Sequence, residues 1–296
     1  MFGNSPNINL CQERYMSSVK KFNITLVFVA CLLCALFSAT AFADEAKTDI
    51  DYTETPVYID GLLSFRGYTV DETTYLPLEC TAAVLGYEPE STFDTETNTL
   101  TVAVEDIEIA VCKDDDYISA NGRYFFLPDG YMEIDGSAVV PIDAIEKIFT
   151  LEANWDEELG AYDLDTANKA ILVSGDEFYD ENDLYWMSRI ITYESGNQPV
   201  AGQIGVGNVV LNRVESSRFP DTIKDVIFQQ GQFAPVAAGA IYLDPYDISV
   251  VCAKMVFEGY NTVGESLFFQ QGRYGANWIS QNTKFVINIA DHNFFL

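Results

Sequence analysis

Hydrophobic side chains recur at helical spacing in residues 184–196, and the face that they form ends in an acidic residue. Leu184, Met187, Ile191 and Glu194 lie three or four positions apart, as on one face of an α-helix. A carboxylate among core-facing residues is partly desolvated, which raises its pKa. A carboxylic acid that stays protonated near neutral pH can protonate a leaving-group oxygen. Glu194 is therefore a candidate catalytic acid; the alternative is that it only ends the helix and faces solvent.

The two ends of this predicted helix carry candidate capping residues. Asn182 or Asp183 can cap the first turn, and Gly196 can end the helix in a left-handed conformation. Tyr193 adjoins Glu194 but faces away from the apolar stripe, so we predict that it contacts substrate.

Residues 57–164 show a different pattern, in which short alternating runs are typical of strands. A strand, a helix that follows a proline, and a hairpin are predicted twice, over residues 74–102 and 138–164. Asp60 and Gly61 predict a tight turn in an opening hairpin. The pattern resembles the domain named for the N-terminus of copper amine oxidases, which recurs as an accessory module on secreted bacterial proteins. The segment has no histidine, so we expect no copper site and leave its ligand unknown.

The N-terminus has the pattern of a targeting segment. Lys20 and Lys21 precede an apolar run, and Ala41-Phe42-Ala43 is an Ala-x-Ala cleavage site. We predict a signal peptide over residues 1–43, with Met16 as a possible true start. The mature chain is then secreted to the cell wall without a stable membrane span; the alternative is an uncleaved anchor, because the run is long enough to span.

Charge divides the rest of the chain. Residues 1–43 carry +2 and residues 184–296 carry −2, so the net charge of the whole chain, −29, belongs to residues 44–183. An acidic surface opposes binding to nucleic acid. We predict an acidic accessory domain over residues 44–164, a linker over 165–183 rich in Asp, Asn and Gly, and a second domain over 184–296. Cys80 and Cys112 could form a disulfide or stay reduced, whereas Cys252 fits a buried helical position.

A long ordered set of motifs follows Glu194. It comprises Glu194-Ser195-Gly196-Asn197-Gln198-Pro199, Gly202-Gln203-Ile204-Gly205-Val206-Gly207-Asn208, Gly231-Gln232-Phe233-Ala234-Pro235 and a closing His292-Asn293-Phe294-Phe295. These motifs closely resemble the SleB-type cell-wall hydrolase family of spore-cortex-lytic enzymes. The resemblance implies a mainly helical, lysozyme-like domain with a short sheet, so the fold class expected for the chain is α+β. Ser195 and Phe295 stand where the family usually has Ala and Tyr.

Several other chemistries are disfavoured by the residues present. His292 is the only histidine of the chain, whereas zinc peptidases and amidases need two or more imidazoles. Cys252 lies mid-helix, which argues against a Cys–His peptidase, and no Gly-x-Ser-x-Gly turn is present. The Gly202–Gly207 run has the wrong spacing for a dinucleotide site, so we expect its small residues to let two helices approach closely. No metal or organic cofactor is implied.

Carboxylate chemistry on a polysaccharide remains. The resemblance implies a lytic transglycosylase, in which Glu194 acts first as acid and then as base on the MurNAc–GlcNAc bond of peptidoglycan. The alternatives are a muramidase that uses water and a second carboxylate, or an inactive wall-binding protein. Five further residues are predicted to bind substrate: Gln232, Phe233, Phe269, Gln270 and His292. Asn212 and Arg213 are predicted to make structural hydrogen bonds instead.

Overall fold

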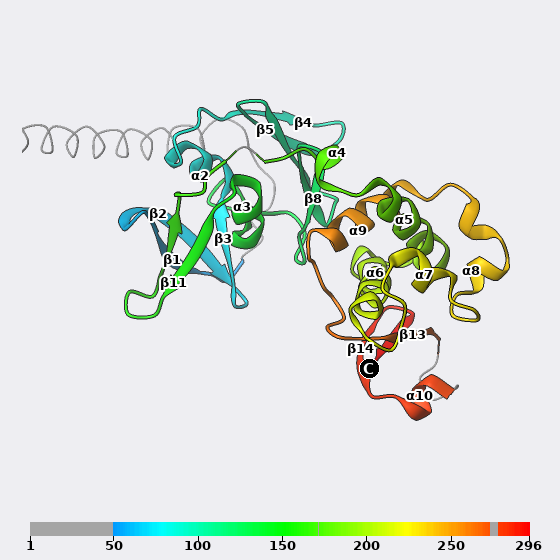
Figure 1. Cartoon of the computed structure of the whole chain (residues 1–296). Coiled ribbons are helices and arrows are strands. Elements are labelled where there is room, and N and C mark those ends of the chain that lie inside the picture. The colour runs from blue at the N-terminus through cyan, green and yellow to red at the C-terminus, as the bar shows by residue number, and fades with distance from the viewer. Residues whose placement is uncertain (1–49, 171, 273–277) are drawn as a thin grey trace, which may run out of the picture. The chain divides into compact units, whose positions relative to one another are not determined.

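The structure is a computed structural model that describes residues 50–170, 172–272 and 278–296 (Figure 1). The predicted signal peptide, residues 1–43, lies outside the described residues. Within the described residues, no helix is long and apolar enough to cross a membrane.

The chain divides into two compact units whose boundary is not a single cut in the sequence. The first unit contains the described residues up to Lys113 together with Tyr131–Leu172. The second contains Val173–Leu296 and also Asp114–Gly130, a segment from the middle of the predicted accessory domain.

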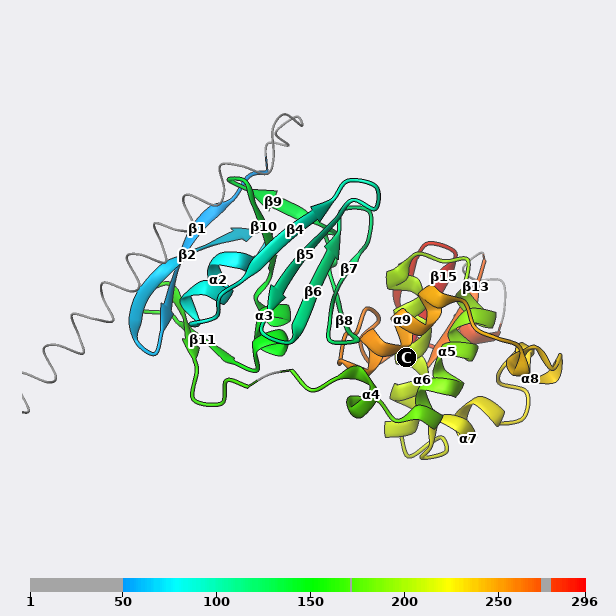
Figure 2. The ribbon, with the colours of Figure 1, turned by 90° about the horizontal axis from the view of Figure 1, so that it is seen from above.

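The first unit is built mainly from strands. Its largest sheet has seven, which in spatial order are β11 (Glu152–Asp156), β12 (Ala161–Asp165), β1 (Thr53–Ile59), β2 (Leu62–Val70), β3 (Thr73–Pro77), β10 (Ser137–Pro141) and β9 (Met132–Ile134). Three further antiparallel strands lie side by side in Figure 2: β4 (Glu90–Asp94), β5 (Thr99–Val104) and β6 (Ile107–Cys112). Alternate residues of β5 and β6 are buried, as expected of strands with one face on a core.

The predicted repeat of the first unit is confirmed. Helix α2 (Leu78–Val84) follows β3 and precedes the β4–β5 hairpin, and α3 (Ile142–Phe149) follows β10 and precedes the β11–β12 hairpin. Pro77 and Pro141 occupy the N-cap positions of the two helices. The opening turn also has its predicted form, because Asp60 and Gly61 have φ of 49° and 76°, the left-handed values of a tight hairpin turn.

The second unit is mainly helical with a small sheet. Helices α5 (Glu181–Ser195), α6 (Val200–Glu215) and α9 (Asp247–Phe257) pack against one another at its centre (Figure 2). The smaller helices are α4 (Gly175–Phe178), α7 (Ile223–Phe228), α8 (Ala234–Ala237), η1 (Ala240–Tyr242) and α10 (Trp278–Asn282). A three-stranded antiparallel sheet has the order β13 (Phe268–Gln271), β15 (His292–Phe295) and β14 (Phe285–Ile289). The mixed α+β class expected from the sequence is confirmed.

The central helix α5 keeps its predicted apolar face but not its predicted caps. Met187 and Ile191 are fully buried. The N-cap is Asp180, whose side chain accepts a hydrogen bond from the Asp183 amide, because the helix begins before the position that the apolar pattern indicated. Gly196 has a right-handed conformation, with φ of −60°. A Cβ there would lie 2.8 Å from the Tyr246 ring, so close packing, not a left-handed turn, requires the glycine.

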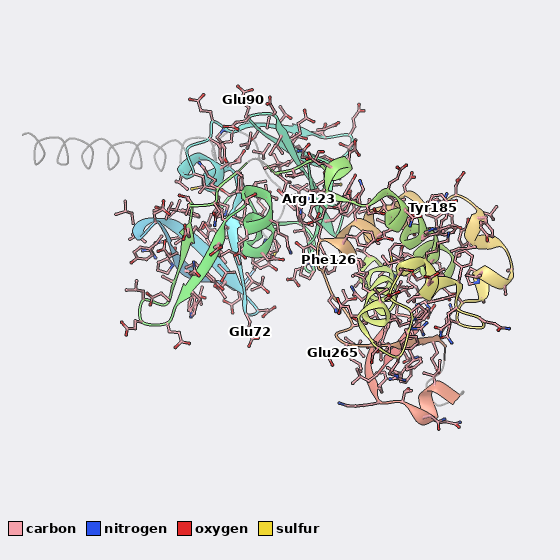
Figure 3. All side chains as sticks on the ribbon, in the orientation of Figure 1. Glu72, Glu90, Arg123, Phe126, Tyr185 and Glu265 are labelled. Carbon is pink, nitrogen blue, oxygen red and sulfur yellow. The ribbon has the colours of Figure 1, made fainter. Side chains whose placement is uncertain are left out.

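The hairpin of β7 (Tyr117–Ala120) and β8 (Arg123–Phe126) is part of the second unit. Phe126 belongs to the same buried cluster as the core residues of α5, α6 and α9. Arg123, labelled with Phe126 in Figure 3, forms a bidentate ion pair with the buried carboxylate of Glu258, which follows α9. Gly175 donates its amide to the carbonyl of Asn121 in the turn of the hairpin. The end of the predicted linker, residues 165–183, therefore contains helix and buried contacts.

The glycines of α6 allow close helix packing, as the sequence predicted. A Cβ at Gly205 would lie 2.7 Å from Val263 and 2.9 Å from the Phe294 ring. A Cβ at Gly207 would lie 2.7 Å from Val256 on α9. Real Cβ contacts are longer than this, so a methyl group at either position forces the elements apart.

We expect Gly207→Ala to destabilise the second unit by about 1–3 kcal/mol, because overpacking between α6 and α9 outweighs the gain in helix propensity. Gly202→Ala is the matched control on the same helix, since its nearest neighbour would be the Gln198 Cβ at 3.2 Å. Urea unfolding of the two variants measures the difference. Equal midpoints for Gly207→Ala and the wild type would contradict the packing argument.

Candidate active site

A cleft of about 410 Å³ in the second unit contains Glu194. It lies between the helical part of the unit and the small sheet, because its lining comes from α5, α6, α8, α10, β13 and β15. The residues that line it are Glu194, Arg213, Gly231, Gln232, Phe233, Ala234, Phe268, Phe269, Gln270, Gln271, Ile279 and His292. Glu194 is the only carboxylate among these described lining residues.

Helix α5 places the Glu194 carboxyl group in this cleft one turn after the buried Ile191. Burial raises the pKa of Glu194 from 4.5 to about 7, although the Ala234 amide, which hydrogen-bonds the carboxylate, and the charge of Arg213 both act to lower it. Desolvation is the largest of these effects, as the position of Glu194 on the apolar stripe led us to expect. The carboxyl group is therefore partly protonated at neutral pH, which suits a general acid.

The turn before α8 supplies the donor to Glu194. Gly231 has φ of 77°, a conformation that glycine adopts without strain. Phe233 is the N-cap of α8, so the next amide, that of Ala234, points out of the helix and is available to the carboxylate. The Gly-Gln-Phe motif thus has a structural reason: it brings an N–H group to the acid.

Most of the predicted substrate-binding residues meet at this cleft. Gln232, Phe233, Phe269, Gln270 and His292 all line it. The side chain of Gln232 is exposed, whereas Phe233 and Gln270 are buried. The Phe269 ring packs edge-on against His292, with ring centroids 5.4 Å apart. Strand β13 carries Phe269 and Gln270 to the cleft, as predicted for this segment.

His292 is almost fully buried, with 1% of its surface exposed. Its burial lowers the pKa of the imidazole, so the ring is neutral at pH 7. Its Nδ1 has no hydrogen-bond partner among the described residues. A neutral ring that lines the cleft can hydrogen-bond a ligand.

Tyr193 does not line this cleft. Its hydroxyl donates a hydrogen bond to the Asp244 carbonyl, 2.9 Å away, and so ties α5 to the loop before α9. The side chain of Tyr193 therefore makes a structural contact, and its predicted contact with substrate stays a prediction.

Arg213 is a cleft residue that sequence reasoning assigned to structure alone. Its predicted structural hydrogen bond is present, from Nε to the Leu267 carbonyl at 2.8 Å. The adjacent Asn212 likewise donates to the Gly264 and Ser266 carbonyls. Arg213 nevertheless lines the cleft with Glu194. No local pattern in the chain reveals this, because the helix period specifies a face and not what lies opposite it.

The three cysteines of the described residues are thiols, not disulfides. Cys252 is fully buried on α9, and burial raises its pKa to about 12. It is therefore a packing residue, as expected, and not a nucleophile. No cluster of metal-binding side chains occurs among the described residues.

We expect the contribution of Glu194 to the stability of the protein to fall as the pH rises from about 4.5 to about 7, because folded Glu194 retains a proton that the unfolded chain has already lost. Glu194→Gln is neutral at every pH and removes this dependence. The melting temperature of the variant minus that of the wild type should therefore increase across this range and level off above it. Thermal unfolding at several pH values measures the difference, and a constant value would contradict the raised pKa.

Both parts of the chain are similar to known families. Residues 197–295 match the Cell Wall Hydrolase family, and residues 60–162 match the Copper amine oxidase N-terminal domain. The spore cortex-lytic enzyme of Bacillus cereus is 36% identical over 91 residues, which cover 31% of this chain and 35% of that protein. The enzyme of the same name from Bacillus subtilis is 29% identical over 91 residues, covering 31% of this chain and 30% of that protein.

A solved structure is also similar: the catalytic domain of the germination-specific lytic transglycosylase SleB from Bacillus anthracis. It is 30% identical, and the match covers 40% of this chain and 97% of that chain with a TM-score of 0.38. The chain spans about a third of the length of the curated relatives that it matches.

Proposed function

Because residues 197–295 form a domain of the cell wall hydrolase family, we propose that the protein cleaves the glycan strands of peptidoglycan as a lytic transglycosylase. The relatives are named spore cortex-lytic enzymes, which supports peptidoglycan as the substrate. The observation that carries the proposal is the environment of Glu194. Its carboxyl group is half-buried and has a pKa of about 7, and it lies in a cleft whose aromatic and amide side chains are of the kinds that bind sugars.

In the first step, Glu194 donates its proton to the oxygen of the MurNAc–GlcNAc bond. The bond from C1 of MurNAc to that oxygen breaks, GlcNAc leaves as an alcohol, and positive charge develops at C1. The Ala234 amide holds the carboxyl group toward the cleft and stabilises the carboxylate that proton donation leaves behind.

In the second step, the Glu194 carboxylate removes the proton from the C6 hydroxyl of the same MurNAc. The freed oxygen bonds to C1 and closes a 1,6-anhydro ring, so no water is consumed and Glu194 regains its proton. A single carboxyl group suffices for both steps. This requirement agrees with the described lining, in which Glu194 is the only carboxylate.

The other lining residues are proposed to hold the sugar. Phe233 and Phe269, whose ring centroids lie 6.3 Å apart, offer an apolar wall to a sugar face. Gln232, Gln270 and His292 offer hydrogen-bonding groups for hydroxyl and acetamido groups. We do not include Tyr193 among the residues that hold the sugar, because its hydroxyl already donates a hydrogen bond to the Asp244 carbonyl.

The organisation proposed for the rest of the chain follows from the sequence. Residues 1–43 direct export as a signal peptide, and the acidic first unit serves as an accessory domain whose ligand is unknown. The enzyme then acts outside the membrane, at the wall. We expect no nucleic-acid partner, because the accessory region carries most of the −29 net charge of the chain.

Mass spectrometry of the fragments released from purified peptidoglycan tests the proposal. Fragments with 1,6-anhydro-muramic ends are expected. Reducing ends, heavier by one water, would indicate a muramidase and require a second carboxylate. Binding to peptidoglycan without release of fragments would instead indicate an inactive wall-binding protein.

A further inference from the structure

Arg213 is a buried cation inside the proposed active site. It lies in the last turn of α6 with only 4% of its surface exposed, so its charge is largely removed from water. Its Nε donates to the Leu267 carbonyl at 2.8 Å, which anchors the guanidinium to the segment entering β13. A long flexible side chain is thereby held in one place.

Aromatic rings surround the guanidinium group. Its central carbon lies 4.9 Å from the centroid of the Phe219 ring, 5.1 Å from that of Phe233 and 5.6 Å from that of Phe268. Ring faces attract a cation and exclude water from it. Phe233 also precedes Ala234, whose amide bonds Glu194, so one short segment contacts both the acid and the cation.

The charge of Arg213 is not neutralised by a close ion pair within the described residues. Its Nη1 is buried and has no hydrogen-bond partner there, and none of the ion pairs between described residues includes it. A buried cation without compensation is costly. Proteins keep a buried charge of this kind mainly at functional sites.

Among the described residues, three titratable side chains line the cleft, each from a different element: Glu194 from α5, Arg213 from α6 and His292 from β15. Strand β13 and helices α8 and α10 contribute no titratable residue to the lining. Glu194 is the acidic group that acts on Arg213, whereas the group that acts on His292 is Asp291. Arg213 and Glu194 thus line one cleft without forming a close ion pair.

We propose that Arg213 is a positioning residue that keeps a fixed positive charge in the cleft, so that the Glu194 carboxylate left by proton donation is stabilised until it takes a proton from the substrate. This inference rests on the proposed function, in which one carboxyl group changes from acid to base. Burial alone would favour the neutral form of Glu194 and leave the charged form too costly. A cation at a distance lowers that cost without the contact that would hold Glu194 permanently ionised.

The ionisation of Glu194 itself provides the test. Carbon-13 NMR of glutamate carboxyl groups in the purified protein follows the titration, with Glu194→Gln assigning the signal. Arg213→Met and Arg213→Gln remove the charge, Arg213→Lys keeps it, and Asn212→Ala is the matched structural control. Asn212 ties the neighbouring Ser266 carbonyl to α6 as Arg213 ties that of Leu267, but it carries no charge.

Both neutral variants should raise the titration midpoint of Glu194 by about one pH unit, and Arg213→Lys and Asn212→Ala should leave it near the wild-type value. The release of anhydro fragments at neutral pH should fall about 10- to 100-fold in the neutral variants, mainly in kcat, with the alkaline limb of the pH profile shifted upward. In Arg213→Lys the alkaline limb of the pH profile should return to its wild-type position.

If Arg213→Met or Arg213→Gln folds and the titration midpoint of Glu194 is unchanged in it, the proposed role of Arg213 is wrong. This conclusion holds whether or not the wild type cleaves peptidoglycan. An equal shift in Asn212→Ala would also overturn it, by making the effect structural. Failure of the wild type to release anhydro fragments would instead contradict the proposed function, so the two failures are distinguishable.

Discussion

Glu194→Gln is expected to reduce fragment release from peptidoglycan by about 10³-fold or more, because one side chain supplies both the acid and the base of the proposed reaction. The amide has nearly the same shape as the carboxylic acid and keeps the cleft intact, but it cannot transfer a proton. Mass spectrometry and the rate of reducing-sugar or anhydro-sugar release measure the loss.

The fold of this variant should be preserved. Glu194 is half-buried and its charged form is disfavoured, so a neutral amide should not lower the melting temperature at neutral pH. Glu215→Gln is the matched control, since Glu215 is exposed at the end of α6 and does not line the cleft; it should remain fully active. Retention of a tenth or more of wild-type activity by Glu194→Gln would sink the assignment of Glu194.

Arg123→Met is expected to destabilise the second unit by about 3–5 kcal/mol, because it leaves a buried carboxylate without its cation. The guanidinium donates to both oxygens of Glu258, at 2.7 and 2.5 Å, and the side chain of Glu258 is 1% exposed. The Tyr179 hydroxyl also donates to this carboxylate, at 2.6 Å, and the Phe178 ring stacks 3.6 Å from the guanidinium. Tyr179 alone cannot neutralise the charge.

Hydrogen exchange of the α9 amides would measure this effect inside the second unit. Arg66→Met is the comparison, measured by hydrogen exchange of the β2 amides in its own unit, because the ion pair of Arg66 with Glu54 is also short, at 2.7 Å, but more than half exposed and should be worth about 0–1 kcal/mol. The double variant Arg123→Met with Glu258→Gln should recover much of the loss, since no buried charge remains. A loss for Arg123→Met no larger than that for Arg66→Met would contradict the argument.

Local patterns were sufficient for several elements and for the position of Glu194. Helical spacing predicted α5 and put Glu194 on its buried face, because a period of three to four residues specifies which side chains share a side of a helix. Asp60 and Gly61 predicted a hairpin turn, because few residues tolerate its backbone angles. The glycines of α6 predicted close packing for a similar reason: only a missing Cβ lets Val256 approach so near.

The ends of α5 were predicted less well. Asp180, one turn before the apolar pattern becomes clear, caps the helix, and Gly196 remains right-handed beside the Tyr246 ring. A cap depends on where the chain turns, and the environment of Gly196 comes from a loop some fifty positions later. Neither is encoded in the spacing of apolar residues.

By itself, then, the sequence determined the periodic elements and the position of Glu194 on an apolar face, since each depends on neighbours within a few residues. Only the tertiary structure decided which distant groups meet. It brought Arg213 into the cleft of Glu194, left Tyr193 bonded to the Asp244 carbonyl and joined the hairpin of Arg123 to the buried Glu258. These contacts follow from how whole elements pack, and packing depends on the shape and burial of every face at once.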